Sequence, residues 1–254
     1  MKLLSVESKD MGNVWPVLSE LYYDNLMDAL VHGFHGEVYT DDLKKPNVVY
    51  GVIGWNVYLA GNPSFSGVKT FLKTIPEDSE IHANHKWEDV LKSYFKDRFS
   101  LKTRYQMDAS FIELDTLDRL IDKLPATYHY KAIDQVIYNK ILTEARWGCD
   151  FVGNFKDYED FAKHGFGVVV MDGETVIAGT SSYIYFNGGY EIEIITREDY
   201  RGQGLGTCVA AHFIKETLKK GLIPHWDAAH QTSMKLAEKL GYRLKKTYTV
   251  YRID

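Results

Sequence analysis

Few of the residue patterns that mark specialised classes of protein occur in this sequence. Its 254 residues contain only two cysteines, which is too few for a disulfide framework. We therefore expect Cys149 and Cys208 to be free, buried thiols. No run of ~18 apolar residues is present, so no membrane-spanning helix is expected. The first residues become polar too early for a secretory signal peptide. These absences together predict a cytoplasmic protein without a membrane partner.

An excess of positive charge is missing as well. The formal net charge is -5, which does not favour nucleic acid as a partner. All of the negative excess lies in residues 1–124, whereas the charges of residues 125–254 are balanced. A neutral second half suits a site that accepts an anionic ligand.

The clearest domain boundary lies near Leu124-Pro125, because a helix pattern ends before this proline. The part before it combines helix and strand patterns. Apolar residues at helical spacing predict one amphipathic helix over Asn13–Leu30. Residues of high β-propensity predict a strand over Val48–Ala60, in which Gly51 and Gly54 mark a break.

Two histidine pairs in this first part have a spacing of three residues. His32 with His35, and His82 with His85, could each ligate a metal ion from one side, but no third ligand is evident for either pair. We therefore expect no metal site.

The second part begins with a strand-like segment, Tyr128–Ile133, and a short helix that Asp134 caps. Two turn sequences, Asp172-Gly173 and Asn187-Gly188-Gly189, then separate segments of high β-propensity. Such turns predict an antiparallel meander of three strands. The last of these strands, Tyr190–Thr196, leads into a glycine-rich loop.

After that loop, an apolar stripe that begins at Leu205 predicts a helix that ends near Gly221. A short strand over Leu222–Trp226 follows, and then a second helix that ends at Gly241. The alternation of apolar residues from Tyr242 to Tyr251 predicts a final strand.

The loop Arg201-Gly-Gln-Gly-Leu-Gly206 stands between the meander and the first of these helices. Glycine allows a sharp turn and a close approach of the backbone to a ligand. The N–H groups in the first turn of a helix point at an anion, and the helix dipole favours negative charge there. The loop therefore predicts a site for a phosphate or pyrophosphate.

Three kinds of glycine loop could account for this segment. A dinucleotide-binding fingerprint would use Gly202 and Gly204, with Asp227 about 20 residues further on, but its third glycine position is Thr207. Two hairpins also precede the loop, and parallel doubly wound sheets are not built from hairpins. A P-loop requires Gly-Lys-Ser/Thr, which is absent. The loop matches the third kind, Arg/Gln-x-x-Gly-x-Gly/Ala after an antiparallel strand.

This arrangement resembles the GCN5-related N-acetyltransferase (GNAT) superfamily over residues 126–254. The segment Pro224–Tyr242 resembles a larger branch that includes zwittermicin A resistance-type acetyltransferases. The resemblance implies an α+β fold class, in which residues 125–254 form a C-terminal GNAT domain with a mixed, mostly antiparallel sheet flanked by helices. Residues 1–124 would form the extra N-terminal α/β domain of that branch, as a substrate cover or in a homodimer.

The resemblance also implies acetyl-CoA as co-substrate and no metal. The strands Tyr190–Thr196 and Leu222–Trp226 would separate and leave a cleft for pantetheine, and the pyrophosphate would bind N–H groups of the glycine loop. The cofactor-binding residues that it implies are Ile194, Ile195, Thr196, Arg201, Gly202, Gln203, Gly204, Leu205, Gly206, Thr207, His230 and Ser233.

Direct attack on a thioester requires an amine that has lost its proton. An amine with a pKa near ~10.4 is neutral in only about one molecule in 2,500 at pH 7, a deficit of roughly 4.6 kcal/mol. A positioned base is the usual remedy. Glu191 and Glu193 share one face of the strand that would border the acetyl group. They are the candidate bases, or else solvated residues of a sheet face.

The usual proton donor to the departing thiolate is missing. Many members of the superfamily place a tyrosine in the second helix, but the matching position is Ala237. His230 and Ser233 are candidate catalytic donors in its place, with Tyr242 as a third, although a histidine at a helix start often bonds the local backbone. The N–H near Ile194 or Ile195 would stabilise the oxyanion.

The sequence therefore predicts an acetyl-CoA-dependent N-acetyltransferase that acts on the amine of a small molecule. A non-catalytic protein that binds or senses acyl-CoA on the same fold is the alternative, supported by Ala237. The pattern identifies neither the acceptor nor which of Glu191 and Glu193 is the base.

Overall fold

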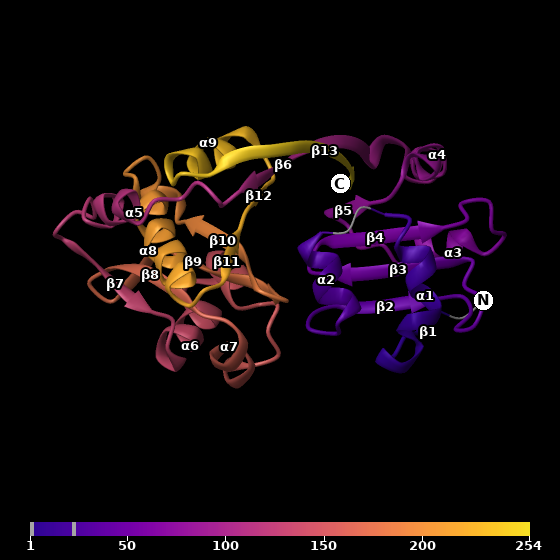
Figure 1. Ribbon diagram of the computed structural model, residues 1–254, viewed down its shortest axis with the longest axis horizontal. Coiled ribbons are helices and arrows are strands. Elements are labelled where there is room, and N and C mark those ends of the chain that lie inside the picture. The colour runs from indigo at the N-terminus through magenta and orange to yellow at the C-terminus, as the bar shows by residue number, and fades with distance from the viewer. Residues whose placement is uncertain (1–2, 22–23) are drawn as a thin grey trace. The chain divides into compact units, whose positions relative to one another are not determined.

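The computed structural model describes residues 3–21 and 24–254. The chain forms two compact units (Figure 1). The first comprises Met1–Arg104 and Tyr248–Asp254, and the second comprises Tyr105–Thr247. Within the described residues, no helix is both long and apolar enough to cross a membrane.

The first unit is built on strands that follow one another along the chain. Strands β2 (Glu37–Thr40), β3 (Val48–Ile53) and β4 (Asn56–Gly61) are antiparallel, and β5 (Ser79–His82) lies parallel to β4. The short β1 (Leu4–Ser5) pairs with β2. The helices of this unit are α1 (Met11–Leu18), α2 (Asn25–Val31), α3 (Val68–Leu72) and α4 (Glu88–Phe95), with the 3-10 helices η1 (Ser8–Asp10), η2 (His85–Trp87) and η3 (Lys96–Arg98).

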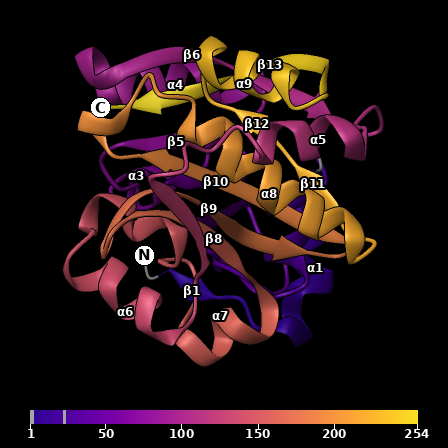
Figure 2. The ribbon, with the colours of Figure 1, turned by 90° about the vertical axis from the view of Figure 1, so that its left-hand side faces the viewer.

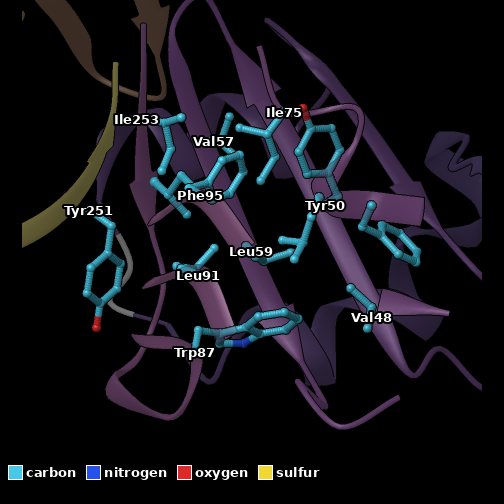
Figure 3. Packing of buried hydrophobic residues seen from close by; sticks show 13 residues of the cluster. Val48, Tyr50, Val57, Leu59, Ile75, Trp87, Leu91, Phe95, Tyr251 and Ile253 are labelled. Carbon is cyan, nitrogen blue, oxygen red and sulfur yellow. The ribbon is translucent and has the colours of Figure 1, made fainter. Parts of the chain in front are cut away.

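Both faces of β4 are buried, which explains its nearly continuous apolar sequence. Val57 and Leu59 belong to a core cluster that includes Trp87 and Leu91 (Figure 3). Tyr58, the residue between them, donates its hydroxyl to the carboxylate of Asp24 before α2, at 2.7 Å. Successive side chains of a strand point to opposite faces, so helices cover this sheet on both sides.

The second unit contains a sheet in the order β11-β10-β9-β8-β7. The strands β7 (Tyr128–Ala132), β8 (Gly167–Asp172), β9 (Thr175–Phe186) and β10 (Gly189–Thr196) are antiparallel in sequence order, whereas β11 (Ile223–His225) lies parallel to β10. The predicted meander is confirmed. Gly173 and Gly188, with φ of 53° and 97°, occupy its turns in the left-handed conformation that glycine favours.

Helices cover both faces of this second sheet. Val168 and Val170 of β8 pack against α8 (Leu205–Lys219), whereas Val169 and Met171 pack against residues of α6 (Gln135–Thr143), η4 (Arg146–Phe151) and α7 (Tyr158–His164). In both ribbon views α8 lies along β8, β9 and β10 (Figures 1 and 2). The remaining helices are α5 (Leu114–Ile121), η5 (Glu198–Tyr200) and α9 (Gln231–Lys239).

Two strands contain residues of both units: β6 (Phe99–Asp108) and β13 (Arg243–Ile253). β13 pairs with β5 through its last residues, and β6 pairs with β12 (Asp227–Ala228) through Tyr105 and Gln106. The hydrogen-bonded order of the first sheet is therefore β1-β2-β3-β4-β5-β13-β6-β12.

The single helix predicted over Asn13–Leu30 is wrong. α1 ends at Leu18, and α2 begins at Asn25. Asp24 has an extended backbone and accepts a hydrogen bond from the N–H of Met27 at 2.8 Å, so it caps a new helix. The apolar pattern continued across the break because both helices bury residues against the same sheet. Residues 22–23 of the predicted helix lie outside the described residues.

Two further expectations are corrected by the structure. The strand predicted over Val48–Ala60 is a hairpin, with Gly54 at φ 53° in the turn between β3 and β4. Cys208 is buried, as expected, but Cys149 is exposed, because it lies on the outer side of η4 rather than in the core.

The division between the units falls after Arg104 instead of after Leu124. Pro125 follows α5, but Leu117 of α5 is buried in a cluster with residues of α8, so this helix belongs to the second unit. At the other end of the chain, β13 returns to β5. A proline thus marks the end of a helix without marking the end of a unit.

Phe213 of α8 anchors the second unit, and its truncation should destabilise the protein. Its ring is fully buried, stacks on Phe166 with centroids 4.3 Å apart, and lies 6.3 Å from Tyr190 of β10. Phe213→Ala should lower the free energy of unfolding by about 3–5 kcal/mol in urea titrations. Val136→Ala, at an exposed position of α6, is the control and should change it by less than ~0.5 kcal/mol. Equal effects would contradict this assignment of the core.

Candidate functional site

Strands β10 and β11 form a fork. Their parallel pairing is confined to Gly189–Glu191 of β10 and Ile223–His225 of β11. The chain then leaves β10, and β12 pairs with β6 instead. On this side of β10, residues 192–196 therefore have no strand partner in the described part of the chain. A free strand edge offers backbone N–H and C=O groups to an extended ligand.

The carboxylate of Glu191 holds the fork at the point where the strands part. One oxygen accepts a hydrogen bond from the N–H of Asp227 at 3.0 Å, and the other is bonded to Nδ1 of His225. Glu191 is only 6% exposed. After His225 the chain no longer pairs with the backbone of β10. The Glu191 carboxylate therefore accepts the hydrogen bond of the Asp227 N–H in place of a backbone carbonyl.

Tyr242 forms a hydrogen bond to β11 next to the fork. Its buried hydroxyl donates to the carbonyl oxygen of Pro224 in β11 at 2.7 Å. Burial, with a smaller contribution from the charge of Glu191, raises the pKa of Tyr242 well above its usual value. This hydroxyl is a structural donor to the backbone, which argues against its use as a proton donor in catalysis.

The glycine loop reaches the start of α8 through two left-handed residues. Gly202 has φ 80° and Gly204, the N-cap residue, has φ 82°. Neither has atoms within 4 Å of the position that a Cβ would occupy. In the described structure, no backbone acceptor reaches the N–H groups of residues 202–206. The loop is an exposed cradle of donors, which suits an anion.

This cradle lies at the Thr196 end of the free edge. A Cβ placed on Gly206 would lie 3.3 Å from the hydroxyl oxygen of Thr196. Arg201 donates from Nε to the carbonyl oxygen of Thr196 at 3.2 Å. The fork at Glu191 marks the opposite end of the edge, so a ligand anchored at the loop can extend along β10 toward the fork.

Residues along the free edge face alternate sides of the sheet. Ile192 and Ile194 pack with the cluster that includes residues of α8, whereas Ile195 packs with the cluster on the opposite face. Glu193 is partly buried. The structure therefore places Ile194, Ile195 and Thr196 between the fork and the glycine loop.

His230 and Ser233 lie together at the start of α9. His230 is the N-cap residue, and its Nδ1 accepts a hydrogen bond from the N–H of Ser233 at 3.1 Å. The hydroxyl of Ser233 in turn accepts from the indole N–H of Trp226 at 3.1 Å. Both side chains thus stabilise local structure. Because Nδ1 of His230 is an acceptor, a neutral ring carries its proton on the exposed Nε2. Ala237 is fully buried in the core behind this helix.

The structure brings together groups that pattern analysis did not connect. His225 lies directly opposite Glu191 in the parallel register, and its Nε2 lies 3.5 Å from the side-chain nitrogen of Gln106 on β6. The parallel pairing of β10 with β11 would have pointed to His225, had its register been known from the sequence. In the described residues, no group of three or more His, Cys, Asp or Glu side chains could hold a metal ion.

A fork beside a glycine loop at a helix start, on a mixed sheet flanked by helices, agrees with the fold that the resemblance to GNAT acetyltransferases predicts. The chain belongs to the GNAT acetyltransferase family, whose model matches residues 16–251. The match includes both units, so it extends well beyond the resemblance noted over residues 126–254. The protein is therefore an acetyltransferase, and the alternative of a non-catalytic sensor is not favoured.

Individual relatives support this assignment. The uncharacterized N-acetyltransferase YdfB of Bacillus subtilis (strain 168) is 28% identical over 233 residues, which cover 85% of each chain. The crystal structure of a GCN5-related N-acetyltransferase-like protein from Streptococcus suis 89/1591 is similar with a TM-score of 0.87 and 34% identity, over 97% of this chain and 99% of that chain. A tandem GNAT protein from the clavulanic acid biosynthesis pathway shares the fold, with a TM-score of 0.57 and 10% identity over 99% and 97% of the two chains.

Removing the hydroxyl of Tyr242 should change how stability depends on pH. In the unfolded chain tyrosine ionises near pH ~10, but the pKa of folded Tyr242 is well above that value. The unfolded state therefore loses this proton first, and stability that is present below pH ~10 is lost as the pH rises above it. Tyr242→Phe should cost ~1 kcal/mol at pH 7.

Above pH ~10, the stability of the Tyr242→Phe variant should fall less steeply, by up to about 1.4 kcal/mol per pH unit. Urea titrations between pH 7 and 11.5 measure this difference. Parallel stability curves for the two proteins would contradict the buried, neutral state of this hydroxyl.

Proposed function

We propose that the protein transfers an acetyl group from acetyl-CoA to the amine of a small molecule. The observation that carries the proposal is the continuity of the site in the second unit. A cradle of N–H groups at residues 202–206 adjoins one end of a free strand edge, and a polar fork closes the other end. An anion joined to an extended arm with a reactive end fits this order of features.

The residues present fit coenzyme A. Its pyrophosphate would be held by N–H groups of Gly202 to Gly206, where the dipole of α8 also favours negative charge. Amide groups of the pantetheine arm would pair with backbone groups of Ile194 and Thr196 that point to the free edge, whereas Ile195 directs its backbone groups to β9. Arg201 braces the loop against Thr196. When bound, the coenzyme would supply an acetyl thioester at the fork.

The side chains at the fork are suited to removing a proton from an amine. Such an amine is almost fully protonated at neutral pH, so a base is needed. Glu191 and Glu193 are the acidic residues of β10, and Glu191 lies at the parting point of the strands. The proton donors assigned to the released thiolate are His230, through its Nε2–H, and Ser233, through its hydroxyl. Ser233 can donate because its oxygen only accepts from Trp226.

A negative charge in the loop should weaken binding of coenzyme A. Gln203 is exposed in the cradle, and its side-chain oxygen accepts from the hydroxyl of Tyr128 at 3.3 Å. Gln203→Glu preserves this acceptor and the size of the side chain, but it places a carboxylate beside the pyrophosphate site. Repulsion of ~1–2 kcal/mol should weaken binding about tenfold in isothermal titration.

The matched control is Gln135→Glu. This exposed residue also begins a helix, α6, but that helix covers the opposite face of the sheet. Coenzyme A affinity should be the same in this variant as in the wild type. A loss of similar size in both variants, or in neither, would place the pyrophosphate elsewhere.

Release of thiol from acetyl-CoA tests the reaction itself. With a panel of primary amines, the wild-type protein should release thiol at a rate that depends on the amine, and the acetylated amine should form in equal amount. Binding of coenzyme A without turnover on any amine would favour a sensor. Failure to bind coenzyme A would reject the proposal altogether.

A further inference from the structure

Glu191 makes contacts that differ from those expected of a base open to a substrate. Both oxygens of its carboxylate have partners, the N–H of Asp227 and Nδ1 of His225, and the side chain is buried. A carboxylate in this position holds and orients other groups. The group that it orients most directly is the imidazole of His225.

The hydrogen bonds define the protonation of a neutral His225 ring. An ionised carboxylate only accepts, so Nδ1 of His225 must carry the hydrogen that is donated to Glu191. The lone pair then lies on Nε2. The side-chain nitrogen of Gln106, a donor, lies 3.5 Å from this Nε2, which agrees with an acceptor at that position. The imidazole can take up a proton at Nε2 once an incoming amine displaces the long contact with Gln106, while Glu191 stabilises the protonated ring.

If the pantetheine arm of acetyl-CoA lies along the free edge of β10, its thioester end lies near this imidazole. The phosphate cradle adjoins Thr196, and the free edge runs from there to Ile192, which spans ~13 Å at ~3.3 Å per residue. His225 is the last residue of β11 that pairs with β10, and it lies opposite Glu191. An arm that starts at the cradle therefore ends beside His225.

We propose that His225 is the catalytic base of the acetyl transfer and that Glu191 is the residue that positions it; this rests on the proposed function. An ammonium proton of the acceptor moves to Nε2 of His225 and later to solvent. The lone pair that is freed on nitrogen forms the C–N bond to the acetyl carbon as the C–S bond breaks. The thiolate takes a proton from His230 or Ser233, and that donor regains a proton through solvent as the amine nitrogen loses its second one. Amide and free thiol are thus formed.

The other groups around this imidazole are suited to the role. Phe186 packs against the ring at 6.3 Å between centroids. Glu191 of β10 is hydrogen-bonded to the ring. Asp227 of β12 donates its backbone N–H to the same carboxylate, and Tyr242 before β13 donates to the carbonyl oxygen of Pro224, the residue before His225. Tyr242 stays neutral because burial raises its pKa. The Glu191 carboxylate, which is hydrogen-bonded to the ring, favours its protonated form, as a base that must accept a proton requires.

Nitrogen-15 NMR of the histidine side chains tests the assignment without any substrate. His225 should show a protonated Nδ1 and an unprotonated Nε2 near neutral pH, with its signals assigned by their loss in His225→Asn. Glu191→Gln, which keeps an acceptor for Asp227, should abolish this preference. The opposite tautomer in the wild type would overturn the proposal.

The catalytic role of His225 is tested by steady-state kinetics with the primary amine that the wild-type protein acetylates fastest. His225→Asn retains an N–H donor for Glu191 but has no base, so kcat/KM should fall about 100-fold at pH 7. The loss should shrink as the pH approaches the ionisation of the amine, where free amine is abundant. The control His129→Asn, at an exposed position of β7, should retain the wild-type rate.

Glu191→Gln should move the acidic limb of the pH profile of kcat/KM to lower pH, because the protonated imidazole of His225 loses its carboxylate partner. A purely structural role of Glu191 would leave that limb in place. The proposal is overturned if His225→Asn keeps its rate, or if Glu193→Gln alone loses it. A wild-type protein that binds coenzyme A but acetylates no amine would instead reject the proposed function.

Discussion

The hydrogen bonds of the Glu191 carboxylate to Asp227 and His225 fix the point at which β11 separates from β10. A strand that leaves a sheet exposes unpaired backbone groups, and a buried N–H without an acceptor is costly. Glu191 supplies that acceptor on β10, so β11 can separate after three paired residues. The free edge of β10 and the position of His225 at its end both depend on this separation. In the proposed mechanism, the same carboxylate holds the fork and positions the imidazole of His225.

The two ends of the free edge have complementary properties. At Thr196 the edge adjoins a loop whose left-handed glycines leave backbone donors open to solvent. At Glu191 it meets a buried, hydrogen-bonded set of polar side chains. An anionic anchor and a reactive terminus can thus be held at a fixed separation by backbone geometry alone.

Local signals in the sequence predicted those parts of the fold in which turns and caps decide the structure. The hairpins at Gly173 and Gly188, the cap at Asp134 and the loop before α8 were all read from short patterns. Pairings between distant segments could not be predicted in this way. The return of β13 to β5 and the contact of His225 with Glu191 depend on strand register across the chain. The division of the chain into units was therefore misplaced, and His225 was not recognised.

The central claim is that a bound coenzyme lies along β10 with its phosphates at the glycine loop and its sulfur at the fork. A crystal structure of the complex with coenzyme A tests this most directly. We expect pyrophosphate oxygens within hydrogen-bond distance of N–H groups of residues 202–206, and the sulfur beside Ile192 and His225. A pyrophosphate bound away from the loop, or a sulfur directed away from the fork, would contradict it.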